Sequence, residues 1–240
     1  MVKSEIRRFV FDGVDFCYEL KRKRIKNLYI TVKGDGTACV SAPLSVPICD
    51  IEKLLKAKRQ NIVGAIQRQS FLPTLWVDED SHEVCLYGKR RRYAVTDGKN
   101  GVDITDDCVT VTCDGADRTK AAIIYVRAIK KDFQRLAMQI CDQTYVDFCD
   151  RVSKFPTIKF RDMVSRWGSC RSRDGVITLS FGLAIAPPQC IRYVIAHEFS
   201  HLLCPDHSKR FYAVLASVLP EHKTLRSALK NFRLQKPFIT

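Results

Sequence analysis

Short runs in which apolar and polar residues alternate dominate the first part of the chain and predict β-strands. Two of these runs, 28–32 and 37–40, flank the Gly-Asp-Gly segment at 34–36, a pattern typical of a hairpin. Residues 1–46 are therefore expected to be mainly β-structure. The next segment, 47–67, carries apolar residues at intervals of three and four and predicts a helix.

Strand-like runs return at 83–87, 93–96 and 108–112. The basic run Lys89-Arg90-Arg91-Arg92 lies between the first two of them. It is expected to form a turn or a solvated edge, with phosphate binding as the alternative. From 118 to 149 the apolar residues recur every three or four positions, which predicts a long amphipathic helix.

The change of period near residue 115 is the best candidate for a domain boundary. It separates a β-rich N-terminal region with one helix, 1–115, from a second domain, 116–240. A single continuous fold is the alternative. Asp117 or Thr119 could cap the helix that opens the second domain, and the sequence shows no internal repeat.

The last third of the chain combines two predicted strands with two predicted helices, so the expected fold class is α+β. Strands are expected at 157–164 and 176–182. A helix is expected at 188–203, because Pro187 and Pro188 suit a helix start and Pro205 prevents its continuation. Ser208 is a natural N-cap for a further helix that runs to about 219.

Four of the five histidines lie in the last 44 residues, and three of them are spaced as a zinc hydrolase requires. In a helix, His197 and His201 share one face a single turn apart, so both rings can bind one tetrahedral metal ion. Glu198, beside the first of them, can reach a metal-bound water without being a ligand itself. The segment 197–201 therefore predicts the core of a catalytic zinc site.

The expected third ligand is His207, which follows His201 after a short turn, and Glu221 is the rival. Three neutral imidazoles leave a fourth tetrahedral position open to water, as in catalytic rather than structural zinc sites. Glu198 is then expected to take a proton from the attacking water and pass it to the leaving amine. Cys170 and Cys204 are the cysteines close enough to the histidines to be considered as thiolate ligands.

Composition is that of a soluble globular protein, with 46% apolar and 28% charged residues among 240. The charged N-terminus does not resemble a signal peptide, and no apolar run is long enough to cross a membrane. Eleven cysteines are an odd number without any Cys-x-x-Cys pair, which favours free thiols and a cytoplasmic location over a disulfide framework.

The net charge of +14 is concentrated around the histidines, since residues 151–240 carry 15 basic and 5 acidic side chains. Such a field attracts polyanions or acidic substrates. Nucleic acid is therefore a possible partner of the basic surface. The alternative is a solubilising surface without a specific partner, because no recognisable nucleic-acid module accompanies the charge.

The motifs of the last third resemble the YgjP-like metallopeptidase family, a group of predicted metal-dependent hydrolases. The resemblance covers about residues 160–232 and rests on Arg166-Trp167-Gly168-Ser169-Cys170, Ala186-Pro187-Pro188, Tyr193-Val194-Ile195-Ala196-His197-Glu198, His201-Leu202, His207-Ser208-Lys209-Arg210-Phe211 and Pro220. It implies a zincin-like core related to SprT-like and Wss1-like proteases, with the three histidines as ligands and Glu198 as the acid/base.

The resemblance also implies that the segment 166–170 lies against the active site as a loop. Its backbone N–H groups, or the Arg166 guanidinium, could stabilise a developing oxyanion. Arg166, Trp167, Gly168, Ser169 and Cys170 are therefore candidate substrate or oxyanion residues. For Trp167, packing in the core is an equally strong alternative.

The leading functional hypothesis is a cytoplasmic zinc metallopeptidase that cleaves peptide or protein substrates, with proteins associated with nucleic acid as a candidate substrate class. One alternative is a nucleoside-triphosphate pyrophosphatase, although that chemistry usually uses magnesium with oxygen ligands. The other is a nucleic-acid-binding module with a non-catalytic zinc site. The sequence predicts no oligomeric state.

Overall fold

The computed structural model describes residues 4–11, 14–32, 37–63, 75 and 82–234 and has a mixed α+β architecture. The chain divides into two compact units, Met1–Leu72 and Pro73–Thr240. Each unit has a hydrophobic core of its own. Among the described helices, none is both long and apolar enough for a membrane span.

The described part of the first unit contains a four-stranded sheet and helix α1, and its elements are β1 Ser4–Phe11, β2 Val14–Lys23, β3 Tyr29–Val32, β4 Ala38–Pro43 and α1 Ile48–Ala57. The predicted hairpin is confirmed, because β3 pairs antiparallel with β4, while the turn at 33–36 lies outside the described residues. Ile51 and Leu55 of α1 are buried in the same core as Leu20 and Val40 of the sheet. The predicted helix is confirmed over Ile48–Ala57, a turn at Lys58 interrupts it before the helical residues 59–63, and its part beyond residue 63 lies outside the described residues.

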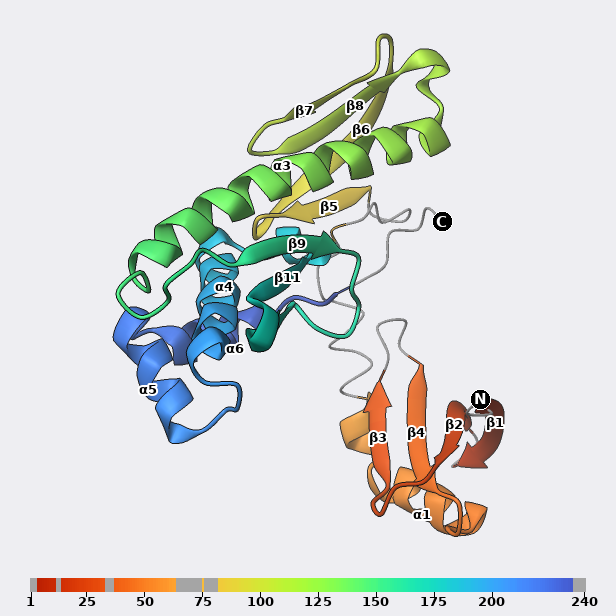
Figure 1. Ribbon diagram of the computed structural model, residues 1–240. Helices are drawn as coiled ribbons and strands as arrows, with labels where there is room; N and C mark the ends of the chain where they lie inside the picture. The colour runs from red at the N-terminus through yellow and green to blue at the C-terminus, as the bar shows by residue number, and fades with distance from the viewer. Residues whose placement is uncertain (1–3, 12–13, 33–36, 64–74, 76–81, 235–240) are drawn as a thin grey trace. The chain divides into compact units, whose positions relative to one another are not determined.

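The second unit begins with another four-stranded sheet followed by a long helix (Figure 1). Its elements are β5 Glu83–Leu86, β6 Lys89–Asp97, β7 Gly101–Ile104, β8 Cys108–Cys113, the 3₁₀ turn η1 Asp114–Ala116 and α3 Arg118–Val146. Asp117 caps α3 by accepting a hydrogen bond from the Lys120 N–H at 2.9 Å, as the sequence predicted. The short strand β7 was not predicted.

The two sheets have the same connectivity. The strand orders are β1-β2-β4-β3 and β5-β6-β8-β7, and in both the successive pairings are antiparallel, parallel and antiparallel. A helix follows each sheet, α1 in one case and α3 in the other. The chain therefore contains a structural repeat that its sequence does not reveal, because many different alternating sequences satisfy one pairing pattern.

The predicted boundary at 115/116 falls inside the second unit. Val111 and Cys113 of β8 share one hydrophobic core with Tyr125 and Ile129 of α3. The change of apolar period thus marks the passage from a strand to the helix that packs on it. It does not mark a break between two cores.

The basic run at 89–92 lies in strand β6 and not in a turn. All four residues pair with β5, and Arg92 alone of them also pairs with β8. Lys89, Arg90 and Arg92 are exposed, as expected of a solvated run. Arg91 is only 8% exposed. Its guanidinium donates to the backbone carbonyls of Leu86 at 2.6 Å and Thr105 at 2.7 Å. This arginine therefore has a structural role, since a buried charge is stable only when its donors are satisfied.

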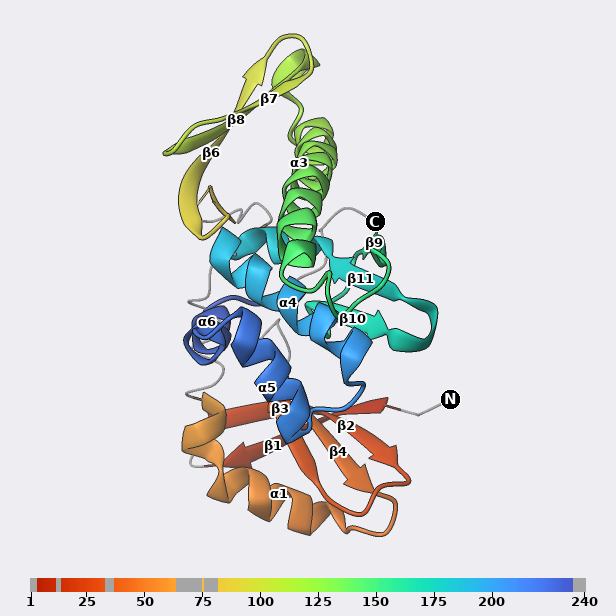
Figure 2. The ribbon, with the colours of Figure 1, turned by 60° about the vertical axis from the view of Figure 1, so that its left-hand side comes forward.

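The rest of the second unit surrounds one buried helix, α4 (Figures 1 and 2). Its elements are β9 Thr157–Arg161, β10 Gly168–Arg171, η2 Ser172–Asp174, β11 Val176–Ser180, η3 Phe181–Ile185, α4 Pro188–Leu203, α5 Lys209–Val218 and α6 His222–Leu229. The three strands form a sheet in the order β10-β11-β9. Both views show α4 between α3 and the pair α5 and α6, with the three-stranded sheet beside it.

Helix α4 begins and ends where the prolines predicted. Ile191, Ile195 and Phe199 are fully buried on one side of it, and Val194 is nearly so on the side that carries the histidines. Ser208 caps α5, as predicted, by accepting a hydrogen bond from the Phe211 N–H. Helix α6, which follows Pro220, was not predicted.

Candidate metal centre and the adjoining cavity

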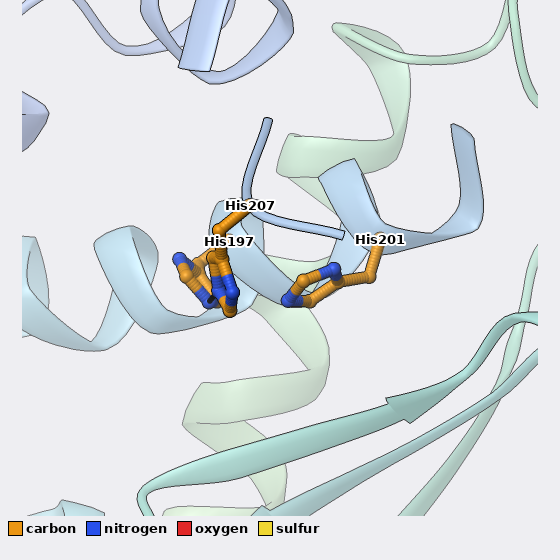
Figure 3. Close-up of side chains that lie close together, drawn as sticks. All are labelled: His197, His201 and His207. Atoms are coloured by element: carbon orange, nitrogen blue, oxygen red, sulfur yellow. Dashed lines mark hydrogen bonds between the residues drawn. The ribbon is translucent and has the colours of Figure 1, made fainter. Parts of the chain in front are cut away.

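Three histidines of the second unit gather at the end of α4. His197 and His201 lie one turn apart on the helix, and His207 reaches them from the loop before α5 (Figure 3). Their ligand atoms all lie within 4.8 Å of one another. In the described part of the chain, no other group of three or more histidine, cysteine, aspartate or glutamate side chains gathers in this way.

The turn between the two helices brings His207 back to α4. Cys204 ends the helix in an extended conformation ahead of Pro205, and Ser208 starts the next helix. The loop is therefore short, and the Nε2 atoms of His207 and His197 lie 3.1 Å apart. Two imidazole nitrogens on one tetrahedral zinc ion, each at about 2.0–2.1 Å, would be separated by about 3.3 Å.

Hydrogen bonding and burial prepare two of the rings for a cation. The Nδ1 of His201 lies 3.1 Å from the Cys204 carbonyl, so Nδ1–H donates to it and Nε2 keeps a free lone pair. Burial lowers the pKa of His197 to about 4, and the neighbouring histidines add to this effect. Burial also lowers the pKa of His201. Both rings are therefore neutral near pH 7, as metal ligands must be.

The Nδ1 of His197 is buried and has no hydrogen-bond partner among the described residues. Because Nε2 is the atom that faces His207, this Nδ1 lies on the far side of the ring, and Nε2 is the nitrogen available to a cation. The donor set is nitrogen only, which suits zinc better than magnesium or calcium. The residues present therefore fit a transition-metal ion.

One aromatic side chain packs against all three histidine rings. Phe211 of α5 is fully buried, and its ring centroid lies 4.6 to 4.9 Å from those of His197, His201 and His207. A rigid ring in contact with all three imidazoles restricts their rotation. Phe211 thus helps to organise the three rings.

Glu198 lies on the same helix and is only 5% exposed. Burial raises the pKa of this carboxyl to about 7, and the charge of Arg166 counteracts the rise. Gly168 lies directly against it, because a Cβ built on the glycine would be 2.8 Å from Glu198 Oε1 and 2.9 Å from Cγ. The carboxylate is thus held between α4 and β10.

The segment 166–170 lies beside the histidines, but it is only partly a loop. Gly168, Ser169 and Cys170 belong to β10, which pairs antiparallel with β11, with Gly168 opposite Leu179. The short alternating pattern that would predict such a strand is absent, because the segment contains a glycine and no β-branched residue. The expected loop is therefore corrected to an edge strand.

Arg166, Trp167 and Gly168 line a cavity of about 370 Å³ that reaches His197 and Glu198. Ser169 and Cys170 are not among its lining residues. Burial, with the nearby Glu198 charge, raises the pKa of Cys170 to about 12. Cys170 is therefore a neutral thiol and a poor metal ligand.

The other expected alternatives lie outside the cluster. Glu221 is exposed at the start of α6 and does not belong to the group of metal-binding side chains. Cys204 contributes its backbone carbonyl to His201, and its thiol is not part of the group. His207 is thus the third member that the described residues support.

Sequence reasoning missed the far wall of the cavity, which α6 and the residues after it provide. Arg226, Leu229, Lys230 and Phe232 line that side. A signal was present, because His222, Leu225 and Leu229 follow Pro220 at helical spacing. Recognising α6 would have placed its basic residues near the histidines only if its packing against α4 had also been known.

No curated protein matches this chain. A solved structure, the metallopeptidase zymogen of Pyrococcus abyssi abylysin, is similar over 39% of this chain and 90% of its own, with 18% identity and a TM-score of 0.36. The profile of the YgjP-like metallopeptidase domain matches residues 26–232. A metallopeptidase requires a divalent metal ion and a peptide or protein substrate. This chain belongs to the YgjP-like metallopeptidase family.

Proposed function

We propose that the chain is a zinc-dependent peptidase in which His197, His201 and His207 hold the metal ion and Glu198 transfers the proton. The observation that carries this proposal is the cluster of three imidazoles within 4.8 Å, next to a buried carboxylate on the same helix. Three imidazole nitrogen donors favour zinc. They disfavour the magnesium-dependent hydrolysis of a nucleoside triphosphate, since magnesium prefers oxygen ligands.

Zinc bound by three imidazoles would polarise the substrate carbonyl and lower the pKa of a coordinated water towards about 7. The remaining work belongs to side chains of this protein. Glu198, with a pKa raised to about 7, can accept a proton from the attacking water near neutral pH. The same carboxyl then protonates the leaving amine. Its burial keeps it out of bulk water, where it would be a weaker base.

The edge of strand β10 that faces away from β11 supports a position for the peptide substrate. This strand pairs with β11 along one edge, and no described strand pairs with the other. An extended peptide can add to such an edge through backbone hydrogen bonds. A peptide on β10 would pass Gly168, which contacts Glu198. Arg166, whose charge acts on Glu198, remains the candidate for stabilising the oxyanion.

The cellular setting is also part of the proposal. All eleven cysteines are free thiols, which supports a reducing compartment such as the cytoplasm. The excess of basic side chains in residues 151–240 supports protein substrates that are associated with nucleic acid. This extension stays a prediction.

The decisive experiment combines metal analysis with turnover. Purified protein should contain close to one zinc ion per chain by mass spectrometry of the elements, and Glu198→Gln should retain the metal but lose peptide hydrolysis. The matched control is Glu221→Gln, because Glu221 is an exposed glutamate outside the cluster. It should keep both properties. A Glu198→Gln variant that still cleaves peptides at the wild-type rate would remove the proposed acid/base.

A second pair of variants tests the metal and the substrate class together. His201→Ala should lose zinc and activity, whereas His82→Asn should keep both. Asparagine tolerates the positive φ of 52° at this histidine, which lies outside the cluster. Casein, a DNA-crosslinked protein and UTP are offered in parallel. Magnesium-dependent cleavage of UTP that survives His201→Ala would show that the chain is a nucleotide hydrolase.

A further inference from the structure

The cavity beside Glu198 is lined by apolar side chains and by exposed basic side chains. Its apolar and aromatic lining consists of Trp167, Tyr193, Val194, Leu229 and Phe232. Three basic residues also line it, namely Arg166, Arg226 and Lys230, and all three are exposed. Glu198 is the single acidic residue among the lining residues.

The basic residues have no counter-charge within the cavity beyond Glu198, which the proposed reaction uses. The side chains of Arg226 and Lys230 form no hydrogen bond or ion pair with the described residues. Elsewhere in the same unit partly buried cations pair with acids, as Lys130 does with Asp162 at 2.6 Å and Arg192 with Asp147 at 3.2 Å. Arg226 and Lys230 thus remain available to a ligand.

The charge of Arg226 also acts inside the cavity. Burial raises the pKa of Tyr193, whose side chain lines the wall, and the nearby Arg226 charge counteracts this rise. Arg226 and Lys230 are four residues apart on and just after α6, so they lie on the same side of the helix. A single anionic group can therefore contact both.

We propose that this cavity is a specificity pocket for a carboxylate on an apolar stem, placed next to the bond that is cleaved. The inference rests on the proposed peptidase function, because the pocket also contains His197 and Glu198. Its volume of about 370 Å³ is at the small end of the range of about 300–1,000 Å³ for ligand pockets. It suits one residue of a substrate and not a length of nucleic acid.

The carboxylate has two sources in a peptide. It can be the side chain of a glutamate or aspartate that flanks the scissile bond, or the α-carboxylate of an apolar residue at the C-terminus. In both cases the apolar part packs on Trp167, Tyr193 and Leu229. The oxygens accept hydrogen bonds from Arg226 and Lys230, and charge-assisted bonds of this kind are stronger than neutral ones.

The test uses the zinc-loaded full chain and a peptide whose cleaved bond has been mapped by mass spectrometry. Derivatives carry glutamate or glutamine on either side of that bond, and a shortened pair ends in a free carboxylate or an amide. We expect kcat/KM for one carboxylate peptide to exceed that of its neutral partner by about tenfold. Which pair shows the preference identifies the source of the carboxylate.

The preference must depend on the two basic residues. In the double variant Arg226→Ala with Lys230→Ala the ratio of carboxylate to neutral peptide should fall to about two or less. Lys223→Ala is the matched control, because it removes an exposed positive charge from the same helix outside the cavity. This variant should keep the wild-type ratio. A double variant that retains the full preference would overturn the assignment.

Binding provides a readout that does not require turnover. Glu198→Gln protein should bind the labelled carboxylate peptide more tightly than the neutral one, and a short oligonucleotide should not displace it. Hydrolysis of every pair at equal rates overturns this inference and leaves the proposed function standing. If no peptide is cleaved, the proposed function fails, and equal affinities of the paired peptides then exclude the carboxylate pocket as well.

Discussion

Gly168 and Glu198 are packed so closely that no side chain fits at position 168. A Cβ on the glycine would lie 2.8 Å from Oε1 and 3.1 Å from Cδ of Glu198. Strand β10 thus defines one side of the space in which the buried carboxylate lies. The position of the proposed acid/base therefore depends on the absence of a side chain two residues after Arg166.

This contact predicts that Gly168→Ala strongly lowers kcat. The added methyl group would push the carboxylate away from its place beside the histidines, because the three atoms nearest to it all belong to the Glu198 side chain. Displacement of a catalytic group by about 1 Å can cost about 100-fold in rate. We expect a loss of that size in kcat, with zinc content unchanged.

The control for this glycine is Gly101→Ala in β7. A Cβ at Gly101 meets only a backbone oxygen at 3.7 Å, which is ordinary contact, and no positive φ is recorded there. Its activity should stay near that of the wild type. Equal activity of the Gly168→Ala and wild-type enzymes would contradict the proposed tight fit.

The raised pKa of Glu198 predicts a pH dependence of stability in the metal-free protein. The pKa is about 7 in the folded chain against an ordinary value of 4.5, so the folded state binds more protons between these values. The free energy of unfolding should therefore fall as pH rises from 4.5 through about 7. For this one group the loss is about 3 kcal/mol.

The measurement is urea unfolding in the presence of a chelator, with Glu198→Gln for comparison. The depressed pKa of His197, about 4, acts in the opposite direction over part of this range but is common to both proteins. The difference between them should therefore show the Glu198 contribution. A difference that does not change between pH 4.5 and pH 7 would mean that the carboxyl is not buried.

Phe211 should matter for metal affinity beyond its part in the core. Phe211→Leu fills most of the volume and is expected to cost about 1 kcal/mol of stability. The three imidazoles would lose the flat surface against which they pack, so zinc should bind about tenfold more weakly. Isothermal titration with zinc measures this affinity.

Phe133→Leu is the matched control for that variant. Phe133 of α3 is equally buried in the same core but packs on Phe160 and Phe181 instead of the histidines. It should lose similar stability while zinc affinity stays the same. Parallel losses of affinity in both variants would show that Phe211 acts only through general packing.

His207 is expected to contribute to stability only when the metal ion is bound. His207 is exposed, so His207→Ala should change the stability of the chelator-treated protein by less than about 0.5 kcal/mol. Zinc at about 100 times its dissociation constant should stabilise the wild type by about 2.7 kcal/mol. That gain should be lost in the variant. Thermal unfolding with and without zinc measures both effects.

Local chemistry explains which elements could be predicted. Pro188 and Pro205 bound α4 because proline suits a helix start and cannot continue a helix. Asp117 and Ser208 cap α3 and α5 because their side chains satisfy free N–H groups at the helix start. The spacing of His197 and His201 likewise follows from helical geometry alone.

Other predictions were wrong because the structures concerned depend on partners that are far away in the sequence. The run at 89–92 was expected at a turn or a solvated edge, and pairing with the distant strand β5 makes it part of β6. Gly168 to Cys170 became a strand through pairing with β11, not through their own propensity. The boundary predicted near 115 fell inside one core for the same reason.

The sequence by itself determined the active helix, its caps, the two histidines one turn apart and the glutamate between them, because each depends on spacing within a few residues. Only the tertiary structure decided that His207 meets His197, that Gly168 confines Glu198, and that α6 brings Arg226 to the cavity. Those contacts join different segments of the chain. The local pattern of each segment predicts only which of its faces is apolar. Which of those faces come into contact depends on how α4 packs against α3, α5, α6 and β10.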